Sequence, residues 1–288
     1  MRRRLAGLMT WWARLFIVSL VAVIALDLPG WSFAVPPVFY ALSLVRPPRP
    51  ENPEPRWVEA PVRGRWIAVN SPADKVPSHG IHAYGQTYAI DILHPAPTDA
   101  HTSLGWTGGL RNPSGFSCFG EPVYAVAAGT VVRASDGLRD QRSRSSWPAV
   151  IWMLTVEGLL RELAGPRFIL GNHLVLDHGD GTFSAYAHLR RGSIAVTPGE
   201  RVEAGQQVAA LGNTGNTSEP HLHVQLMDRA RVNAAAGLPF RWRDVQIEPA
   251  GVDKAEGADS AGAGAVVTEG LPGKGQVFTA DHACAGTV

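Results

Sequence analysis

The stretch His221-Leu222-His223-Val224-Gln225-Leu226 decides the fold, because it has the character of a short β-strand. Residues i and i+2 of a strand project from the same face, so His221 and His223 point into one space. The long turn that precedes it, residues 212–220, would place the strand at a rim. This spacing suits a metal site on a sheet, although two histidines on one strand face are by themselves a common coincidence.

Short apolar runs on both sides of this stretch predict more strands, and hence a mainly β fold with an antiparallel sheet or sandwich core. The 31 glycines and 22 prolines of the 288 residues point the same way, because both residue types mark turns. Asp180-Gly181 between two apolar runs predicts a hairpin. The expected strands are residues 66–69, 88–93, 122–126, 129–132, 173–177, 182–188 and 208–211.

One inserted helix is expected at about residues 147–163. Ser146 can cap it, Pro148 suits its first turn, and Gly165-Pro166 would end it. The helix is apolar on most sides, so it either packs on the sheet or faces a membrane.

A second set of polar residues could share the space of the histidine pair. Asp91 lies in an otherwise apolar run and must be exposed at an edge, paired or bound to a metal. His79 and His82 lie upstream of it. One of these, Asp91 and a histidine of the later pair would give three ligands with one position open, as in catalytic zinc sites. His188 is either a buried structural histidine or, near a metal, a proton-transfer group.

At this point the chain resembles the lysostaphin-type, or LytM-domain, zinc endopeptidases of bacterial cell walls. The resemblance covers roughly residues 65–228 and depends on the order and spacing of several motifs. These are QTYAID at 86–91, GEPVYA at 120–125, GTVV at 129–132, GNHLV at 171–175, YAHL at 186–189, Gly199-x-x-Val202-x-x-Gly205, GNTG at 212–215 and HLH at 221–223.

The resemblance implies a peptidoglycan endopeptidase with one zinc ion. Asp91 and His223 would be zinc ligands together with a histidine upstream of Asp91, and His188 and His221 would be the catalytic histidines. The chain departs from the family at Thr87, where the first ligand usually stands four residues before the aspartate. We therefore expect His79 to be the first ligand and His82 to be the alternative, because only these two histidines precede Asp91 closely.

Other functions remain open from the sequence. A non-catalytic LytM-type domain that activates another hydrolase would lack the ligands present here. A cupin-type metal enzyme also uses His-x-His, but its motif has a glutamate a few residues later, and residues 224–227 contain none. A biotinyl-type carrier would need a lysine at the tip of the hairpin near residues 199–205, and this stretch contains none. The near balance of 26 Lys and Arg against 25 Asp and Glu gives no global field for nucleic acid.

The amino-terminal region predicts a membrane anchor at residues 1–45. Arg2-Arg3-Arg4 precede an apolar run that approaches spanning length, a pattern that a cleaved signal peptide shares. Because no clear cleavage site follows, the pattern favours an uncleaved single-pass transmembrane helix with the catalytic domain on the outer side of the membrane. Residues 28–45 are either a second span or a segment lying against the membrane or the domain. A proline-rich linker at 46–56, a peptidase domain at 57–249 and a loosely ordered tail at 250–288 would follow. Peptidoglycan is the expected partner, and a regulatory protein partner is left open.

Overall fold

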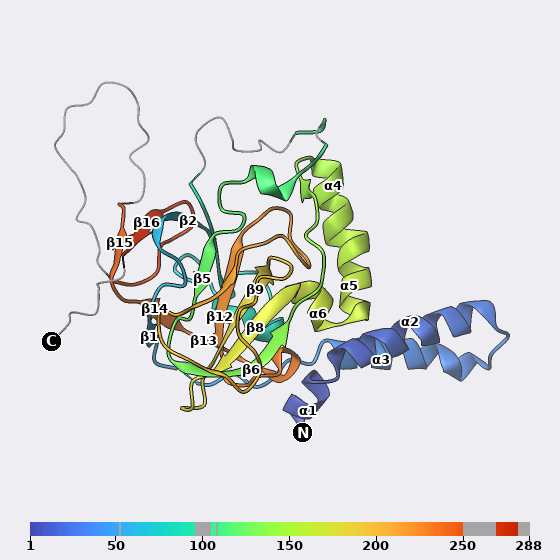
Figure 1. The fold of residues 1–288 in the computed structure, drawn as a ribbon. Coiled ribbons are helices and arrows are strands. Elements are labelled where there is room, and N and C mark those ends of the chain that lie inside the picture. Colours follow the sequence, from blue (N-terminus) through green and yellow to red (C-terminus); the bar gives the residue numbers. More distant parts are fainter. Residues whose placement is uncertain (52, 96–104, 108, 250–268, 282–288) are drawn as a thin grey trace.

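The computed structural model describes residues 1–51, 53–95, 105–107, 109–249 and 269–281 (Figure 1). A ten-stranded antiparallel sheet forms the body, with β13 (Gly237–Leu238) paired to one of its central strands. The other nine strands follow in the order β10 (Arg201–Val202), β6 (Gly129–Ser135), β8 (Asn172–Asp177), β9 (Phe183–Leu189), β12 (Leu222–Met227), β3 (Ile90–Leu93), β2 (Gly64–Asn70), β16 (Val277–Ala280) and β15 (Val245–Ile247). The predicted mainly β, antiparallel fold is therefore confirmed.

Three small sheets complete the β structure. β5 (Pro122–Tyr124) pairs with β11 (Gln207–Ala210), and β4 (Leu110–Arg111) pairs with β7 (Ser143–Arg144), both antiparallel. β1 (Arg56–Val58) runs parallel to β14 (Phe240–Trp242). The strands β1, β4, β7, β13, β14 and β15 were not anticipated from the sequence, because each is only two or three residues long.

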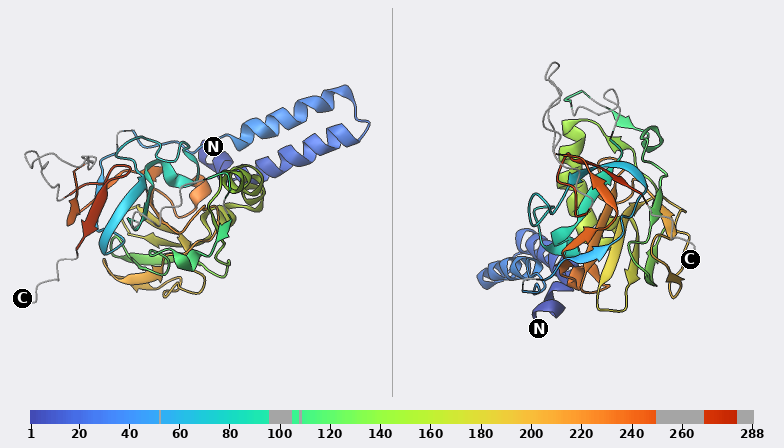
Figure 2. Two further views of the ribbon diagram at one scale, coloured as in Figure 1. Left: turned by 90° about the horizontal axis from the view of Figure 1, so that it is seen from above. Right: turned by 90° about the vertical axis from the view of Figure 1, so that its left-hand side faces the viewer.

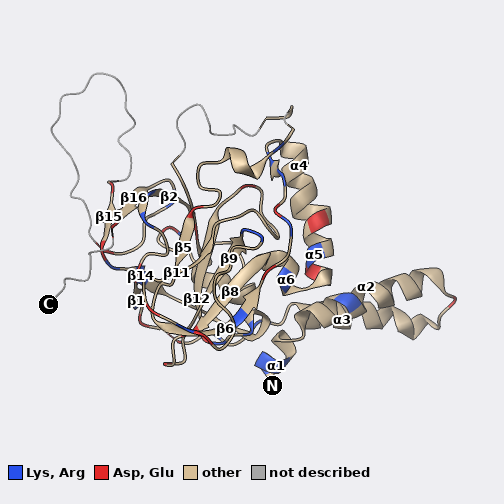
Figure 3. Ribbon diagram, in the orientation of Figure 1, with Lys and Arg blue, Asp and Glu red and all other residues tan. Residues whose placement is uncertain are grey.

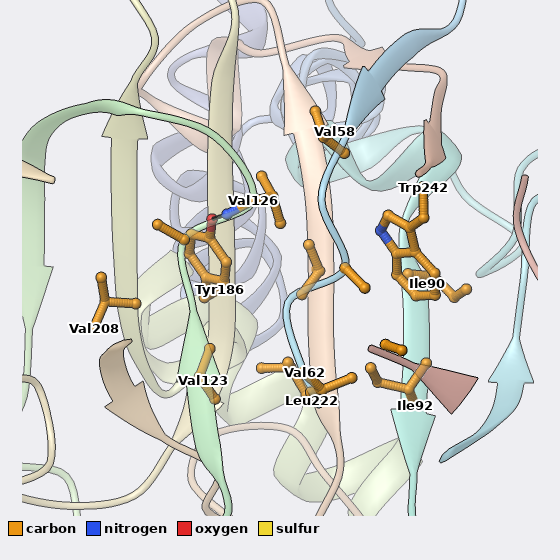
Figure 4. Packing of buried hydrophobic residues seen from close by; sticks show 14 of the residues in the cluster. Val58, Val62, Ile90, Ile92, Val123, Val126, Tyr186, Val208, Leu222 and Trp242 are labelled. Atoms are coloured by element: carbon orange, nitrogen blue, oxygen red, sulfur yellow. Dashed lines mark hydrogen bonds between the residues drawn. The ribbon is translucent and has the colours of Figure 1, made fainter. Parts of the chain in front are cut away.

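The main core lies between the large sheet and the β5–β11 pair (Figure 4). Tyr186 is fully buried there among Val123, Val126 and Val208, and its hydroxyl accepts a hydrogen bond of 2.8 Å from the backbone N–H of Val126. Buried phenols need such a partner, because an unpaired polar group in an apolar core is costly. The core thereby fixes β9 and β12, the strands that carry His188 and His223.

Strand β12 shows how the sequence pattern selects the two faces. Leu222, Val224 and Leu226 belong to the main core, whereas His223 and Gln225 alternate with them and project from the opposite face. All six residues of the strand are buried, so the polar face of β12 is covered by other segments and not by water.

The carboxyl-terminal segment corrects the expectation of a loosely ordered tail. Val277–Ala280 form β16, which lies between β2 and β15 in the large sheet. The Phe278 side chain is fully buried against Trp242, with ring centroids 5.1 Å apart. The prediction was wrong here because so short an apolar run next to Gly- and Ala-rich sequence gives little local signal. Residues 250–268 and 282–288 lie outside the described residues.

Replacing Phe278 with alanine should therefore destabilise the domain by about 3–5 kcal/mol, because the substitution removes a large buried aromatic ring and leaves a cavity. Urea unfolding followed by circular dichroism would measure it. Thr279→Ala, on the less buried side of the same strand, is the matched control and should stay within about 0.5 kcal/mol of the parent. Equal stability of the two variants would show that β16 does not belong to the cooperative core.

The inserted helix is confirmed at nearly the expected residues. It runs as α4 (Trp147–Trp152), a π-helical turn (Met153–Glu157) and α5 (Gly158–Ala164), and a short helix α6 (Pro166–Leu170) follows it. The α4–α5 helix does not bury an apolar face on the sheet as one reading expected, since Met153 is its only buried residue.

The amino-terminal region forms a helical hairpin, and the expected single-pass span is not supported. After α1 (Arg2–Ala6), the helix α2 (Met9–Ala25) has 17 residues, and the chain turns at Asp27-Leu28-Pro29-Gly30. A 3₁₀ turn (Gly30–Ala34) and α3 (Val35–Ser43) then return along α2 (Figure 2). Among the described residues, no helix combines the length and the apolar character needed to cross a bilayer.

The base of this hairpin is packed on the β domain. Arg3 forms an ion pair with Asp228 at 2.8 Å, and the Arg14 Nε donates to the backbone carbonyl of Leu163 at 2.7 Å. Met9 is buried in a second hydrophobic cluster with Tyr84 and Leu170. The division into anchor, linker, peptidase domain and tail stays a prediction. The base of the hairpin and the domain nevertheless share this second hydrophobic cluster.

Candidate metal centre

The register of three neighbouring strands brings the predicted polar residues together. On β12, His223 lies opposite Asp91 of β3 on one side and opposite Ala187 of β9 on the other. His188 follows Ala187 directly, so it reaches the same region from β9. Asp91 and His223 are 132 positions apart in the sequence, and the antiparallel pairing of β3 with β12 makes them neighbours.

His79, Asp91 and His223 form the tightest group. The Nε2 of His79 lies 2.7 Å from Oδ2 of Asp91, and the Nδ1 of His223 lies 2.9 Å from Oδ1 of the same carboxylate. One donor atom from each residue falls within 4.8 Å of the other two. Among the described residues, this is the group of histidine, cysteine and acidic side chains that could hold a metal ion.

Gln225 fixes which nitrogen of His223 faces this group. Its amide nitrogen donates to the carbonyl of Tyr84 at 2.7 Å, so its oxygen must be the atom that lies 2.9 Å from Nε2 of His223. An amide oxygen only accepts, hence Nε2 of His223 carries the proton. In the neutral ring, Nδ1 then has a free lone pair directed at the centre of the group, as a metal ligand requires.

His79 is held in a similar way, and His82 is not part of the group. The Nδ1 of His79 lies 3.0 Å from the hydroxyl of Ser78, which leaves Nε2 facing Asp91. His82 instead contacts the guanidinium of Arg49 at 2.9 Å and the hydroxyl of Thr87 at 3.1 Å. Of the two candidates for the first ligand, the structure therefore places His79 beside Asp91.

Asp91 is a buried carboxylate surrounded by donors. Asn70 of β2 donates to its Oδ2 at 2.8 Å, and only 5% of the residue is exposed. Burial alone would raise the pKa of Asp91, but the nearby imidazoles of His79, His221 and His223 hold it well below 3.8. In the other direction, Asp91 raises the pKa of His223 although burial opposes this. The carboxylate is therefore ionised and available as a ligand at neutral pH.

His188 and His221 adjoin this group with matching tautomers. The Nδ1 of His188 lies 2.8 Å from the carbonyl of Thr214, and the Nδ1 of His221 lies 2.9 Å from the carbonyl of Glu219. Carbonyls accept only, so each ring keeps its proton on Nδ1 and has a free Nε2 lone pair when neutral. The two ring centroids are 4.7 Å apart.

The backbone of His188 supports a functional reading of this residue. Its φ of 62° lies in the left-handed region, which β-strand residues with a side chain rarely adopt. Such strain persists where the surrounding structure over-determines it and is concentrated at functional sites. Burial, with His221 and His223 adding to it, lowers the pKa of His188 well below 6.5, so the ring is neutral at neutral pH.

Three supporting residues were not foreseen from the sequence: Asn70, Ser78 and Gln225. Gln225 had a usable signal, because it stands two positions after His223 on the same strand face. Asn70 and Ser78 had none, since they contact the site only through the pairing of β2 with β3 and through the path of the loop before β3.

The donor set fits zinc. Two imidazole nitrogens and one carboxylate oxygen are the ligand types that zinc takes, and three protein ligands leave a position for water or substrate. Each ligand is also oriented by a second group: Ser78 for His79, Asn70 for Asp91 and Gln225 for His223. Metal-binding histidines typically have such partners, so the site has the supporting contacts of a metal centre.

Comparison with known proteins shows which family the segment that carries His188, His221 and His223 matches. Residues 155–234 match the model of peptidase family M23. That segment includes His188, His221 and His223. The chain therefore carries an M23, or LytM, domain, as the sequence motifs indicated.

Individual relatives are similar over limited stretches. Peptidoglycan DD-endopeptidase ShyA of Vibrio cholerae is 43% identical over 72 residues, which is 24% of this chain and 16% of the relative. Murein hydrolase activator EnvC of Escherichia coli is 28% identical over 138 residues, 45% of this chain and 30% of the relative. The catalytic domain of lysostaphin from Staphylococcus simulans is 23% identical, with 46% of this chain and 83% of that chain covered and a TM-score of 0.28. The matched region thus spans less than a third of the length of either curated relative.

Proposed function

We propose that this protein is a zinc-dependent endopeptidase that hydrolyses peptide bonds in the stem peptides or cross-bridges of peptidoglycan. One observation carries the proposal. The three residues that could hold a metal, His79, Asp91 and His223, lie directly beside two further histidines. In these two, His188 and His221, the Nδ1–H donates a hydrogen bond to a backbone carbonyl. Ligands and proton-transfer groups are thus both available at one place.

A bound zinc ion would supply Lewis acidity and would bring the pKa of a water molecule towards 7. His79, Asp91 and His223 would hold it. His188 and His221 then act on protons, because a free Nε2 can accept one from an attacking water molecule and later return it to the leaving amine. The ring that is protonated at a given stage can also donate to the carbonyl oxygen as charge develops on it.

A groove beside this site is the natural place for an extended peptide. It has a volume of about 1200 Å³ and is lined by residues 139–142, Arg144, Phe119 and the start of α4, among others. None of the site histidines lines it, but a chain of hydrogen bonds joins its wall to His221. The backbone carbonyl of Gln141 in its wall accepts from Asn213, whose side chain contacts Thr217, and Thr217 contacts His221.

The second candidate function is a non-catalytic activator of another wall hydrolase, since one relative carries that name. The presence of the complete residue set argues for catalysis, because an activator has no need to keep three oriented ligands and two aligned histidines.

Digestion of purified wall sacculi by the full chain tests the choice. Mass spectrometry of the soluble products should show peptides with newly formed amino and carboxyl ends, and chelation of the metal should abolish their release. Absence of release by the zinc-loaded chain, together with faster release by an added wall hydrolase, would instead establish the activator function.

Replacing His221 with alanine should separate metal binding from turnover. We expect a loss of about 10²–10⁴-fold in turnover, because the substitution removes a proton-transfer group. Zinc content should stay near that of the parent, since the His221 Nε2 is 3.8 Å from Asp91 and the residue lies outside the three-residue metal group. Activity on sacculi and metal analysis of the same sample measure both. If the variant is as empty of zinc as a ligand variant, the roles assigned here to His221 and His223 are wrong.

The substrate also sets the location and the partners. Peptidoglycan lies outside the cell membrane, so the proposal places the M23 domain on the outer, wall-facing side, with peptidoglycan as its macromolecular partner. Protease added to intact spheroplasts should then degrade the domain.

A further inference from the structure

The α4–α5 helix packs on the protein with its polar side. The carboxylate of Glu157 pairs with Arg144 at 2.5 Å and with Arg161 at 2.7 Å, and all three side chains are at most one quarter exposed. Glu162 accepts a hydrogen bond from the hydroxyl of Tyr84. A helix on the surface of a water-soluble domain normally buries its apolar stripe and exposes its charges. Here the arrangement is reversed.

The opposite side of this helix is apolar and exposed. Leu154 is 62% exposed and Leu160 is 60% exposed, well above the level of residues that merely border a core. The face combines two tryptophans with aliphatic side chains: Trp147, Ile151, Trp152, Leu154, Val156, Leu159 and Leu160. A contiguous apolar surface of this kind marks an interaction site.

The α2–α3 hairpin exposes a second surface of the same character. Its arms are held together by Trp12 with Phe39 and by Phe16 with Tyr40, while large apolar side chains point outward along its length. Ile24 is 76% exposed and Trp31, near the tip, is 73% exposed. Between residues 15 and 45 the only charged residue is Asp27 in the turn.

Basic residues surround the base of the hairpin. A cavity of about 270 Å³ between α2, α6 and the sheet is lined by Arg14, Arg133, Arg167, Arg231 and His173, and no acidic residue lines it. Lys and Arg positions gather around this base on α1, α2 and α6 in Figure 3. Among the described residues, Arg14, Arg133, Arg167 and Arg231 form no ion pair with a carboxylate. The cavity therefore suits an anionic group such as a phosphate.

The two apolar surfaces are oriented so that both can contact one flat lipid layer at the same time. Figures 1 and 2 agree that the hairpin projects from the body and that α4–α5 runs across its base, not along it. The Arg14 guanidinium fixes this arrangement, because it binds the carbonyls of Leu163 and Ala164 at the end of α5. When the hairpin enters a film, the apolar face of α4–α5 can lie along its surface.

We propose that this protein binds the surface of an anionic phospholipid bilayer through three features together. The α2–α3 hairpin enters the acyl region without crossing it, the apolar face of α4–α5 lies in the interface, and the arginine-lined cavity takes a lipid phosphate. Apolar area and attraction to anionic headgroups are the two contributions that bind interfacial helices to membranes. The proposal does not depend on the catalytic assignment.

Flotation of the full chain with vesicles tests the proposal. The chain should float with vesicles of phosphatidylglycerol and phosphatidylethanolamine, and less with phosphatidylcholine alone. The double variant Ile24→Glu/Leu160→Glu should lower the bound fraction about tenfold or more, because it places charges in both apolar surfaces. Arg133→Glu/Arg167→Glu should lower binding to the anionic vesicles about tenfold. The matched control Arg191→Glu/Arg201→Glu, which reverses two exposed arginines away from the hairpin, should have a much smaller effect.

The depth to which the α2–α3 hairpin enters the bilayer is tested with lipids brominated near the bilayer centre, which quench tryptophan emission on contact. The parent should be quenched, and Trp31→Phe should remove most of that quenching because Trp31 lies near the tip. Failure of the full chain to float with anionic vesicles, or equal flotation of the parent and the Ile24→Glu/Leu160→Glu variant, would overturn the proposal. A stable dimer without lipid that this double variant dissociates, combined with no flotation, would assign the apolar surfaces to a second copy of the chain instead.

Discussion

Replacing His223 with alanine should remove both the bound metal and the hydrolytic activity. His223 would contribute one of three protein ligands, and its Nδ1 is aimed at the group by the hydrogen bond from Nε2 to Gln225. Even loss of a supporting contact typically lowers metal affinity or activity about 10–100-fold, so loss of the ligand itself should exceed about 100-fold. Metal analysis by plasma mass spectrometry and release of peptides from sacculi measure the two effects on one preparation.

Two further variants make this result specific. Gln225→Leu keeps His223 but frees its ring to turn, and it should weaken zinc binding by about 10–100-fold with the ligand still present. His178→Ala removes a histidine outside the site, which contacts the carbonyl of Ala128, and should keep zinc and activity. Zinc bound in equimolar amount by His223→Ala would show that the ligand set proposed here is wrong.

His79→Ala should have an effect as large as His223→Ala, whereas His82→Ala should not. The reason is geometric: His79 Nε2 lies 2.7 Å from Asp91, while His82 contacts Arg49 and Thr87. We expect His79→Ala to lose zinc and more than about 100-fold of its activity. His82→Ala should retain zinc in equimolar amount. Isothermal titration of the metal-free proteins with zinc gives the affinities directly.

The reverse pattern, with zinc retained in His79→Ala and lost in His82→Ala, would exchange the two assignments and leave the rest of the site unchanged. Ser78→Ala provides an intermediate case. It removes the hydroxyl that lies 3.0 Å from Nδ1 of His79 and should weaken zinc binding less than removal of the imidazole.

The core of the site was predictable because it depends on local rules. The i, i+2 spacing of His221 and His223 on a strand is a property of extended backbone, and the strand β12 was expected at the right residues. Asp91 stood out as a carboxylate in an apolar strand. The motif resemblance then connected these residues to His79 and His188, and the structure brings all five together.

The remaining parts depend on contacts between distant segments, which local patterns do not encode. The pairing of β12 with β3, and of β3 with β2, brings Asn70 to Asp91, but the strand order cannot be read from any one strand. β16 was missed for the same reason, since four residues become a strand only because they pair with β2 on one side and β15 on the other.

The amino-terminal error has a different physical origin. The apolar run and the arginines before it predicted a span, whereas the turn at Asp27-Leu28-Pro29-Gly30 follows α2, which has 17 residues. The helix at 147–164 was expected from its caps, but its orientation was not. The ion pair of Glu157 with Arg144 of β7 turns the polar side of the helix inward, and this pair forms only once β7 is in place beside the helix.

The packing of the hairpin base on the domain also sets an order of events during synthesis. Arg3 pairs with Asp228, and Met9 shares a cluster with Ala235, so residues made early find their partners only after more than two hundred further residues have left the ribosome. Until then, the apolar hairpin has no folded domain to hold it. Contacts of such long sequence separation slow folding and leave apolar segments exposed to aggregation in the interval. The nascent chain is therefore expected to need either a chaperone or early contact with a membrane at this stage.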